Sequence, residues 1–560
     1  MKFCFTLFLL FILLVATSIL KCAEDGYRLT GIRFSGNKEI STASLRKDLS
    51  LKSAKLYHKI IFWKEPPLFN ELLLAEDLQI LTKRYQENGF LAIDIDVDRE
   101  IDHPGRRLAI TFNIHERKAV KIAELDYLIY SVTTVDSLII RDLIMENEAD
   151  FAAKPGTRFQ DNNIRKTTRQ IINLLQENGF PEPKIEFEIR LIAANTLAQV
   201  RYEIDPGPLC KFGDHLITGN ERISDKTIEK QIYFAHDQLY NFSGIEETQR
   251  RIQQLGVFQI VTIRTLMNEI VDGQIPIEIN VRELPAWSVR TGIGYGLEDR
   301  FRISANIQGR GFPMGAQRTV LNIKHSYLEP YNLNLKIIQP AFPVTDGSLI
   351  LNPFLRKERE SAYQLKRYGV SSTLQWNPTN LTTTFFSYRF ERNYLDLESD
   401  TEDENGELYD EYYNKSSVSA GLSLDNSTPP FFPERGFYAS IVSTLSGLKL
   451  KSRYHYLQGL IDLRKYQTVY SQLVLAGKIK LGSIKPIWGD SRTPIEERFF
   501  AGGSSSIRGW ERGDIGPRNE FDNPVGGNSY LEFSLELRHL IWNIIYGVLF
   551  LDGGNIWSGY

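Results

Sequence analysis

The stretch that decides the fold is FFAGGSSSIRGW, residues Phe499–Trp510. It is a loop rich in glycine and serine that carries one arginine, Arg508, and it lies between segments in which apolar and polar residues alternate. Inside a membrane β-barrel, a guanidinium is best placed in the lumen, where carboxylates can bind it. Two acidic residues further along the chain, Glu536 and Asp552, are candidates for that pairing. The stretch therefore predicts a barrel whose interior loop is held in place.

The segments around this loop alternate with the period of a β-strand. In residues 528–538 the even positions are mostly polar, and the odd positions from Leu531 to Leu537 are apolar. A water-soluble sandwich also alternates, with its apolar face in the core, whereas a membrane barrel turns that face to lipid and its polar face to a wet lumen. The long series of similar segments favours the barrel.

The alternation predicts about 13 strands from residue 287 onward. They are centred near residues 291, 304, 321, 335, 352, 370, 386, 419, 440, 458, 476, 533 and 549. Long polar connections at 396–414 and 486–527 fit extracellular loops, and a short turn at 343–347 fits the periplasmic side.

The N-terminal half repeats itself. QENGF occurs at 86–90 and again at 176–180, with a weaker counterpart, LGVF, at 255–258. The starts of two units also match, as GNKEIS at 36–41 and GNERIS at 219–224. Self-similarity of this kind indicates repeated modules. Each unit is predicted to contain a strand, two helices and two further strands, with a glycine ending the second helix.

The N-terminus is typical of a secretory signal peptide. Lys2 precedes a stretch that is apolar from Phe5 to Leu20, and two acidic residues follow soon after it. The apolar run is short for a transmembrane anchor, which is the alternative interpretation. The sequence leaves open whether Cys22 is lipidated, although Lys21 stands where a lipidation motif needs a small residue.

Composition narrows the possible functions. The chain has 66 Lys and Arg against 69 Asp and Glu, which gives no indication of nucleic-acid binding. Cys4 and Cys22 belong to the signal region, so Cys210 alone remains and neither a disulfide framework nor a cysteine metal site is expected. The eight histidines are scattered, without metalloprotease spacing, and no nucleophile elbow is present. We expect no enzyme, no catalytic residue, no metal and no cofactor.

The repeated units, the loop motif and the segment LDGGNIW at 551–557 together resemble the BamA/TamA superfamily of outer-membrane assembly barrels. The loop motif, Ile507, Arg508, Gly509 and Trp510, is the most specific part of the resemblance. The family usually has Phe or Tyr at the position of Trp510. Three repeats make the chain more similar to the TamA branch than to the BamA branch.

The resemblance implies three α+β POTRA-like repeats followed by an antiparallel transmembrane β-barrel. The implied domains are a signal peptide at 1–22, POTRA-like modules at 27–117, 119–206 and 209–283, and the barrel at 285–560. The family's barrel has more strands than this chain supplies. The sequence thus resembles a barrel that is truncated at its C-terminal end, either biologically or through an incomplete gene model.

The resemblance also implies the site. The loop would fold into the lumen, with Arg508 meeting Glu536 and Asp552 on the wall. The first barrel strand, 287–297, would form a lateral seam that opens and templates a client strand. Its glycines, Gly292, Gly294 and Gly296, fit such a weak strand and fit equally well a kink that curves the barrel wall.

The implied function is the insertion or export of β-rich client proteins at the cell outer membrane, with the repeats in the periplasm. The implied partners are the outer-membrane bilayer, unfolded outer-membrane or secreted clients, and a periplasmic or inner-membrane accessory protein, but no nucleic acid. A two-partner-type secretion porin and a passive porin or adhesin of the same architecture are the alternatives.

Overall fold

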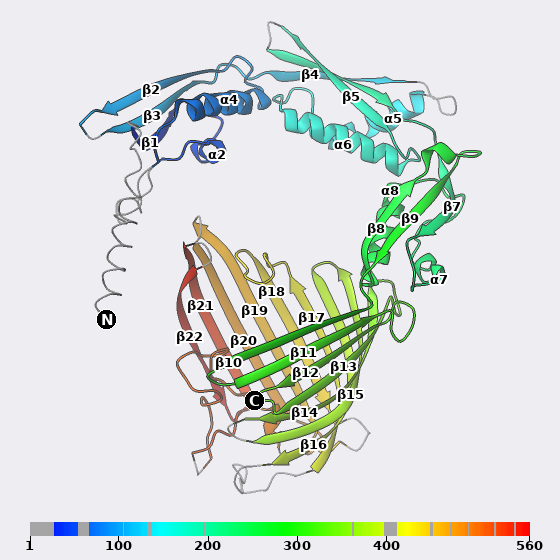
Figure 1. The fold of residues 1–560 in the computed structure, drawn as a ribbon, viewed down its shortest axis with the longest axis vertical. Helices are drawn as coiled ribbons and strands as arrows, with labels where there is room; N and C mark the ends of the chain where they lie inside the picture. The colour runs from blue at the N-terminus through cyan, green and yellow to red at the C-terminus, as the bar shows by residue number, and fades with distance from the viewer. Residues whose placement is uncertain are drawn as a thin grey trace, which may run out of the picture. The chain divides into compact units, whose positions relative to one another are not determined.

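The structure of the protein is a computed structural model, drawn in Figure 1. It describes residues 27–53, 67–104, 106–130, 137–193, 196–360, 363–396, 412–447, 452–470, 473–490, 492–519, 522–542 and 545–560. The expected signal peptide at 1–22, including Cys22, lies outside these residues. Among the helices of the described residues, none is long and apolar enough to cross a membrane. The chain divides into two compact units: one contains the first two repeats, and the other contains most of the third repeat together with the C-terminal half.

The three N-terminal repeats have the element order that the sequence predicts. The first contains β1 (Arg28–Ser35), α2 (Thr42–Asp48), α4 (Glu71–Glu87), β2 (Asp94–Asp102) and β3 (Arg107–His115). The second contains β4 (Lys121–Ile129), α5 (Ser137–Asn147), η1 (Glu148–Asp150), α6 (Asp161–Glu177), β5 (Lys184–Ile192) and β6 (Leu197–Asp205). The third contains β7 (Lys211–Thr218), α7 (Asp225–Glu229), α8 (Phe242–Gln254), β8 (Phe258–Thr265), η2 (Met267–Glu269) and β9 (Gln274–Glu283).

Each repeat forms a three-stranded sheet in which the last strand lies in the middle, in the orders β1-β3-β2, β4-β6-β5 and β7-β9-β8. The first and last strands run parallel in the first two repeats. The alternation of β3 buries Leu108, Ile110 and Phe112 against the apolar face of α4, which includes Leu81 and Tyr85. This burial joins the helices to one face of each sheet and forms a small core within each repeat.

The predicted helix-ending glycines adopt the left-handed conformation that a C-cap requires. Gly89 after α4 has φ 89° and Gly179 after α6 has φ 98°. The amide of the following phenylalanine in each repeat donates back to a helix carbonyl, from Phe90 to Tyr85 and from Phe180 to Leu175. The repeated QENGF sequence thus encodes a helix end at which an aromatic ring turns into the core.

The matching GNKEIS and GNERIS segments form the same turn in the first and third repeats. Gly36 has φ 81° and Gly219 has φ 83°. A Cβ on Gly36 would lie 2.2 Å from the carbonyl oxygen of Ile114, and one on Gly219 would lie 2.1 Å from that of Val281. Glycine is therefore required at both positions, because the turn crosses directly over the last strand of its own sheet.

A carboxylate that the sequence analysis missed closes each of these turns. Glu116 accepts a hydrogen bond from the backbone N–H of Glu39, and Glu283 accepts from that of Ile223 at 2.9 Å. Burial alone raises the pKa of Glu283, but backbone donors and the Arg222 guanidinium outweigh it and hold the pKa below its ordinary value.

The described residues of the second half form one antiparallel sheet of thirteen strands, joined in sequence order from β10 to β22. The strands are β10 (Trp287–Gly296), β11 (Arg300–Arg310), β12 (Arg318–His325), β13 (Tyr331–Pro340), β14 (Gly347–Arg359), β15 (Gln364–Thr379), β16 (Thr382–Asp396), β17 (Tyr412–Asp425), β18 (Gly436–Ser446), β19 (Tyr456–Tyr470), β20 (Leu473–Pro486), β21 (Ser529–Trp542) and β22 (Ile545–Trp557). Each predicted strand centre falls within one of them, so the strand prediction is confirmed. The sheet curls around its inner face, as Figure 1 shows.

The two faces of this sheet have the polarity of a membrane barrel. On β21 the apolar side chains of Phe533 and Leu535 are 40% and 48% exposed on the outer face. Glu532, next to Phe533 in the strand and on the inner face, is 1% exposed. A water-soluble sandwich would bury the apolar residues and expose the acid, so this arrangement favours the barrel over the sandwich.

An ion pair identifies the end of the sheet that faces the third repeat. Arg250 on α8 lies 2.6 Å from Asp346, in the predicted short turn between β13 and β14. Because antiparallel strands alternate in direction, the long connection between β20 and β21 lies at the opposite end. This assignment matches the sides that the sequence predicts for the turn at 343–347 and the loop at 486–527.

Candidate functional site: the lumen loop and the first barrel strand

The connection 487–528, called the lumen loop below, is folded on itself. The Gly503 N–H donates to the Trp510 carbonyl at 3.0 Å, and the Ile515 N–H donates to the Ala501 carbonyl at 3.2 Å. Gly502 has φ 106°, and a Cβ there would lie 2.2 Å from the carbonyl oxygen of Glu511. The glycine-rich sequence thus allows the chain to double back, which presents the arginine of the motif to the wall.

Arg508 sits between two wall acids, in an arrangement called the Arg508 clasp below. Its Nε and Nη2 donate to the two carboxylate oxygens of Asp552 on β22, at 2.5 and 2.7 Å. Nη2 also lies 2.7 Å from Glu536 on β21 and donates to the Ser534 hydroxyl at 3.2 Å. The two acids that the sequence nominates are therefore brought together at this guanidinium.

The surroundings of the clasp reinforce it. The guanidinium carbon lies 3.7 Å from the centre of the Phe550 ring, an arrangement that favours a cation. The Asp552 side chain is 2% exposed, whereas that of Arg508 is 28% exposed. The hydrogen bonds to Asp552 and Glu536 raise the pKa of Arg508 further above its ordinary value. A lysine could not reproduce the planar, two-pronged contact.

Ile507, the neighbour of Arg508, docks the loop by packing. Ile507 is 4% exposed and packs with Ala501 and Ile556. A Cβ on Gly554 of β22 would lie 3.1 Å from the Ile507 side chain, so the glycine makes room for it. Trp510, the last residue of the motif, is 58% exposed and takes little part in this packing.

A second ion cluster, which sequence reasoning missed, binds the start of the loop to the opposite side of the wall. It consists of Glu496 and Glu497 in the short helix η3 (Ile495–Glu497), together with Arg367 on β15, Glu391 on β16 and Lys415 on β17. Lys415 lies 2.7 Å from Glu391 and also pairs with Glu497. Arg367 lies 3.7 Å from Glu391 and 3.8 Å from Glu497. We call these five residues the Glu391 cluster.

The Glu391 cluster is more deeply buried than the clasp. Glu391 is 0% exposed and Lys415 is 3% exposed. Glu496 accepts hydrogen bonds from the Tyr413 hydroxyl and, at 3.4 Å, from the Asn393 amide. Burial raises the pKa of Glu496 well above its ordinary value, and the neighbouring Glu497 carboxylate raises it further. A protonated Glu496 relieves the excess of acids over bases in this cluster.

A third contact joins the loop to the first strands of the sheet. The Ser504 N–H donates to Glu298, in the turn between β10 and β11, at 2.9 Å. Arg512 lies 3.8 Å from Glu298 and forms two 2.9 Å hydrogen bonds to Glu360, after β14. The lumen loop therefore touches the wall at both edges of the sheet and in between.

The predicted seam strand, β10, lies at the edge of the sheet. Its register with β11 is unbroken from Trp287 to Gly296, and Arg310 N–H donates to the Ala286 carbonyl. Antiparallel pairing alternates, so Gly292, Gly294 and Gly296 bond to β11, while Thr291 and Ile293 turn their backbone groups to the free side. The glycines thus weaken the pairing of β10 with β11. Thr291 and Ile293 present unpaired backbone groups at the free edge of the strand.

The described residues contain no group of three histidine, cysteine, aspartate or glutamate side chains arranged to hold a metal ion. Arg508 in the clasp, and Arg367 and Lys415 in the Glu391 cluster, are paired with carboxylates.

The fold and the site define a membrane β-barrel that carries POTRA modules and holds one long loop in its lumen. The family model described as "Omp85 superfamily domain" matches residues 306–560. The POTRA model, described as "Surface antigen variable number repeat", matches residues 27–117 and 211–284. The chain belongs to the BamA/Omp85 superfamily, as the resemblance predicts.

Curated relatives agree with this assignment. The chain is 22% identical over 574 residues to "Outer membrane protein assembly factor BamA" of Neisseria meningitidis serogroup B, covering 95% of this chain and 68% of the relative. It is 19% identical to the protein of the same name from Nitratidesulfovibrio vulgaris, covering 93% of this chain and 65% of the relative. The chain therefore spans about two thirds of the length of these relatives.

A solved structure supports the fold. The BamA crystal structure from Haemophilus ducreyi lacking POTRA domains 1–3 matches with a TM-score of 0.63 at 21% identity, over 78% of this chain and 87% of that chain. The family assignment and the curated relatives place the protein in the outer membrane with its POTRA domains in the periplasm. The closeness to the TamA branch and the stated domain boundaries stay predictions.

Proposed function

We propose that this protein assembles β-rich client proteins into the outer membrane, or exports them, by pairing client strands with the open edge of β10. The proposal takes its general direction from the relatives, which are named as outer membrane protein assembly factors. No cofactor or nucleotide enters the process, and the protein acts as a template rather than as an enzyme.

The observation that carries this proposal is the free edge of β10. Within the described residues, β10 pairs on one side only, with β11. Ile293 and Tyr295, whose backbone groups point to the free side, have side chains that are 77% and 74% exposed. An unpaired strand edge offers a row of N–H and C=O groups to an incoming strand, and that is the physical basis of β-augmentation.

The lumen loop has a defined part in this proposal. The Arg508 clasp fixes it to β21 and β22, and the Ser504–Glu298 hydrogen bond connects it to the first hairpin. The loop thereby holds the extracellular end of β10 in register with the rest of the wall. Movement of β10 during client pairing then depends on the contact at Glu298 rather than on the deeper clasp.

The test replaces a backbone donor on the free edge without disturbing the β10–β11 ladder. Ile293→Pro removes an N–H that faces away from β11, a position where an edge strand tolerates proline. Ile293→Ala removes the side chain and keeps the N–H. Purified protein is reconstituted in liposomes, and assembly of an unfolded eight-stranded barrel is followed by its heat-dependent mobility on gels.

We expect Ile293→Pro to abolish most client assembly and Ile293→Ala to retain most of it. Equal activity of the proline variant and the parent would contradict the edge-template proposal. In cells, depletion that removes one secreted protein would indicate the secretion porin. Depletion that leaves the outer-membrane proteome unchanged would indicate a passive porin or adhesin.

A further inference from the structure

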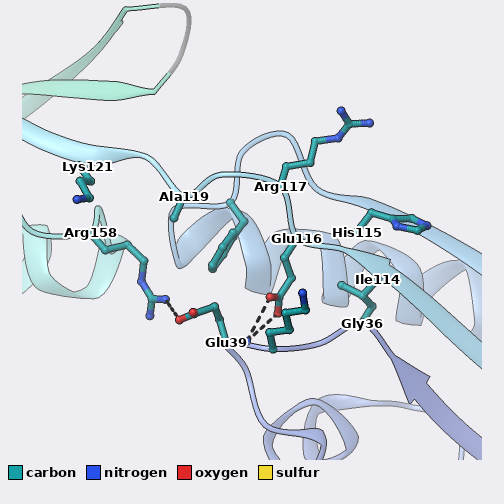
Figure 2. A pocket seen from close by; sticks show the side chains of 11 residues that line it. Gly36, Glu39, Ile114, His115, Glu116, Arg117, Ala119, Lys121 and Arg158 are labelled. Carbon is teal, nitrogen blue, oxygen red and sulfur yellow. Dashed lines mark hydrogen bonds and ion pairs between the residues drawn. The ribbon is translucent and has the colours of Figure 1, made fainter.

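A cavity of about 660 Å³ lies at the junction of the first and second repeats, both in one compact unit. Figure 2 shows the side chains around it, from the turn after β1, the end of β3 and the start of the second repeat. Phe90, Ile114 and Ala119 supply its apolar lining. The function proposed above does not involve this cavity.

The walls of the cavity are fixed by backbone hydrogen bonds. The Val120 N–H donates to the Gly89 carbonyl at 2.8 Å, and the Phe159 N–H donates to the Val120 carbonyl at 2.8 Å. The same pattern recurs after α6, where the Cys210 N–H donates to Gly179 and the Tyr240 N–H donates to Cys210. The two junctions can therefore be aligned residue by residue.

That alignment explains why the first junction is hollow. Ala119 corresponds to Leu209, and Arg158 corresponds to Leu239. A Cβ on Gly179 would lie 2.5 Å from the Leu209 side chain and 2.9 Å from that of Leu239, so two leucines occupy the second site. At the first site a methyl group and a guanidinium take their places, which leaves space and adds positive charge.

The acids of the cavity already have partners, whereas three of its bases do not. Glu39 lies 2.9 Å from Arg158, and Glu116 accepts hydrogen bonds from the Glu39 N–H and, at 3.0 Å, from the Tyr85 hydroxyl. Within the described part of the chain, the basic groups without an ion pair or hydrogen bond at this cavity are Lys38, Arg117 and Lys121. At the second junction, by contrast, Lys211 is paired with Asp237 at 3.1 Å.

We propose that this junction cavity binds a peptide segment of a partner protein that carries a carboxylate next to an apolar side chain. Lys38 and Lys121 complement the carboxylate, and Phe90 with Ala119 accommodates the apolar group. The acids at Glu39 and Glu116 disfavour a multiply charged phosphate, but they can accept hydrogen bonds from peptide N–H groups. This combination favours a peptide over a phosphate group.

The test uses the full chain in detergent and the fluorescein-labelled, C-terminally amidated pentapeptide Gly-Leu-Asp-Phe-Asp, with the equally labelled and amidated Gly-Leu-Asn-Phe-Asn as the probe without side-chain charge. Binding is measured by fluorescence anisotropy. The cavity variants are the charge reversal Lys38→Glu with Lys121→Glu and the filling substitution Ala119→Leu, which copies the second junction. Arg190→Glu, on the exposed part of β5, is the matched surface control.

We expect the acidic probe to bind and the charge reversal to weaken it by about tenfold, since two favourable charge contacts become repulsive. Ala119→Leu should weaken both probes by filling the apolar part. Equal binding of the two probes, or an equal loss in Arg190→Glu, would overturn the proposal. Displacement of the peptide by inorganic phosphate at equal concentration would overturn the choice of a peptide and point to a phosphate or lipid headgroup.

Discussion

The lumen loop is held at two places by ion clusters that differ in size and in burial. In the Arg508 clasp one cation faces two acids, and the side chain of this cation is 28% exposed. In the Glu391 cluster acids outnumber bases, and Glu391 is 0% exposed. Charge complementarity sets the loop position at the clasp, while at the Glu391 cluster desolvation makes every missing partner costly. The clasp therefore orients the middle of the lumen loop, and the Glu391 cluster fixes the start of the loop to the wall.

The largest effect should come from breaking the buried cluster. Lys415→Met leaves Glu391 and Glu497 without their ammonium group, so the free energy of unfolding should fall by about 3–5 kcal/mol. Urea unfolding in detergent measures this loss of stability. The matched control is Lys336→Met on β13, an exposed lysine, for which we expect a loss below about 1 kcal/mol. Equal losses in the two variants would show that the cluster does not stabilise the loop.

A smaller effect should come from removing the clasp. Arg508→Met should cost about 2 kcal/mol, since hydrogen bonds to charged groups are lost at a site that solvent partly reaches. Arg508→Lys should recover only part of it, because an ammonium cannot form the two-pronged contact with Asp552. Protease cleavage within the lumen loop reports undocking. Full recovery by lysine would mean that charge alone, without geometry, holds the loop.

The Glu391 cluster should also make stability depend on pH above about pH 4.3. The pKa of Glu496 in the folded protein lies above the ordinary value of about 4.3, so the protonated form favours the docked loop. The stabilisation that protonated Glu496 contributes is fully present below about pH 4.3, and it is lost as the pH rises through the raised pKa of Glu496. We expect the difference in unfolding temperature between the parent and Glu496→Gln to change across this range. A constant difference from pH 4 to pH 9 would contradict it.

The smallest effect is expected at the contact with the first hairpin. Glu298→Gln keeps the shape of the side chain but weakens its bonds to Ser504 and Arg512, which lies 3.8 Å away. Stability should fall by less than about 1 kcal/mol, because the site is partly exposed. Client assembly in liposomes should change more than stability does. A change in stability without any change in client assembly would show that the Glu298 contact does not control the movement of β10.

The strands, the helix ends and the clasp could be predicted from the sequence, each for its own reason. The thirteen strands follow from alternation, because a one-residue slip would turn every apolar side chain from lipid to lumen. The helix ends at Gly89 and Gly179 follow from their repeated sequence. Arg508 and its two acids were nominated because a family resemblance supplied their pairing, and the geometry places all three together.

The Glu391 cluster could not be found in this way. Its members come from four segments between Arg367 and Glu497, and no spacing connects them. Alternation could have placed Glu391 and Lys415 on the inner face of their strands, but it does not say which part of a long loop meets them. The roles of Glu116 and Glu283 could not be predicted for a similar reason, since their partners are backbone amides far away in sequence.

The most direct measurement is a double-mutant cycle between Arg508 and Asp552. The free energies of unfolding of the parent, Arg508→Met, Asp552→Asn and the double variant are compared in detergent. We predict a coupling energy of about 2 kcal/mol, because each substitution removes the same pair of hydrogen bonds between Arg508 and Asp552. A coupling energy near zero would mean that the guanidinium does not bind this acid, and that the loop is not held in the lumen by the clasp.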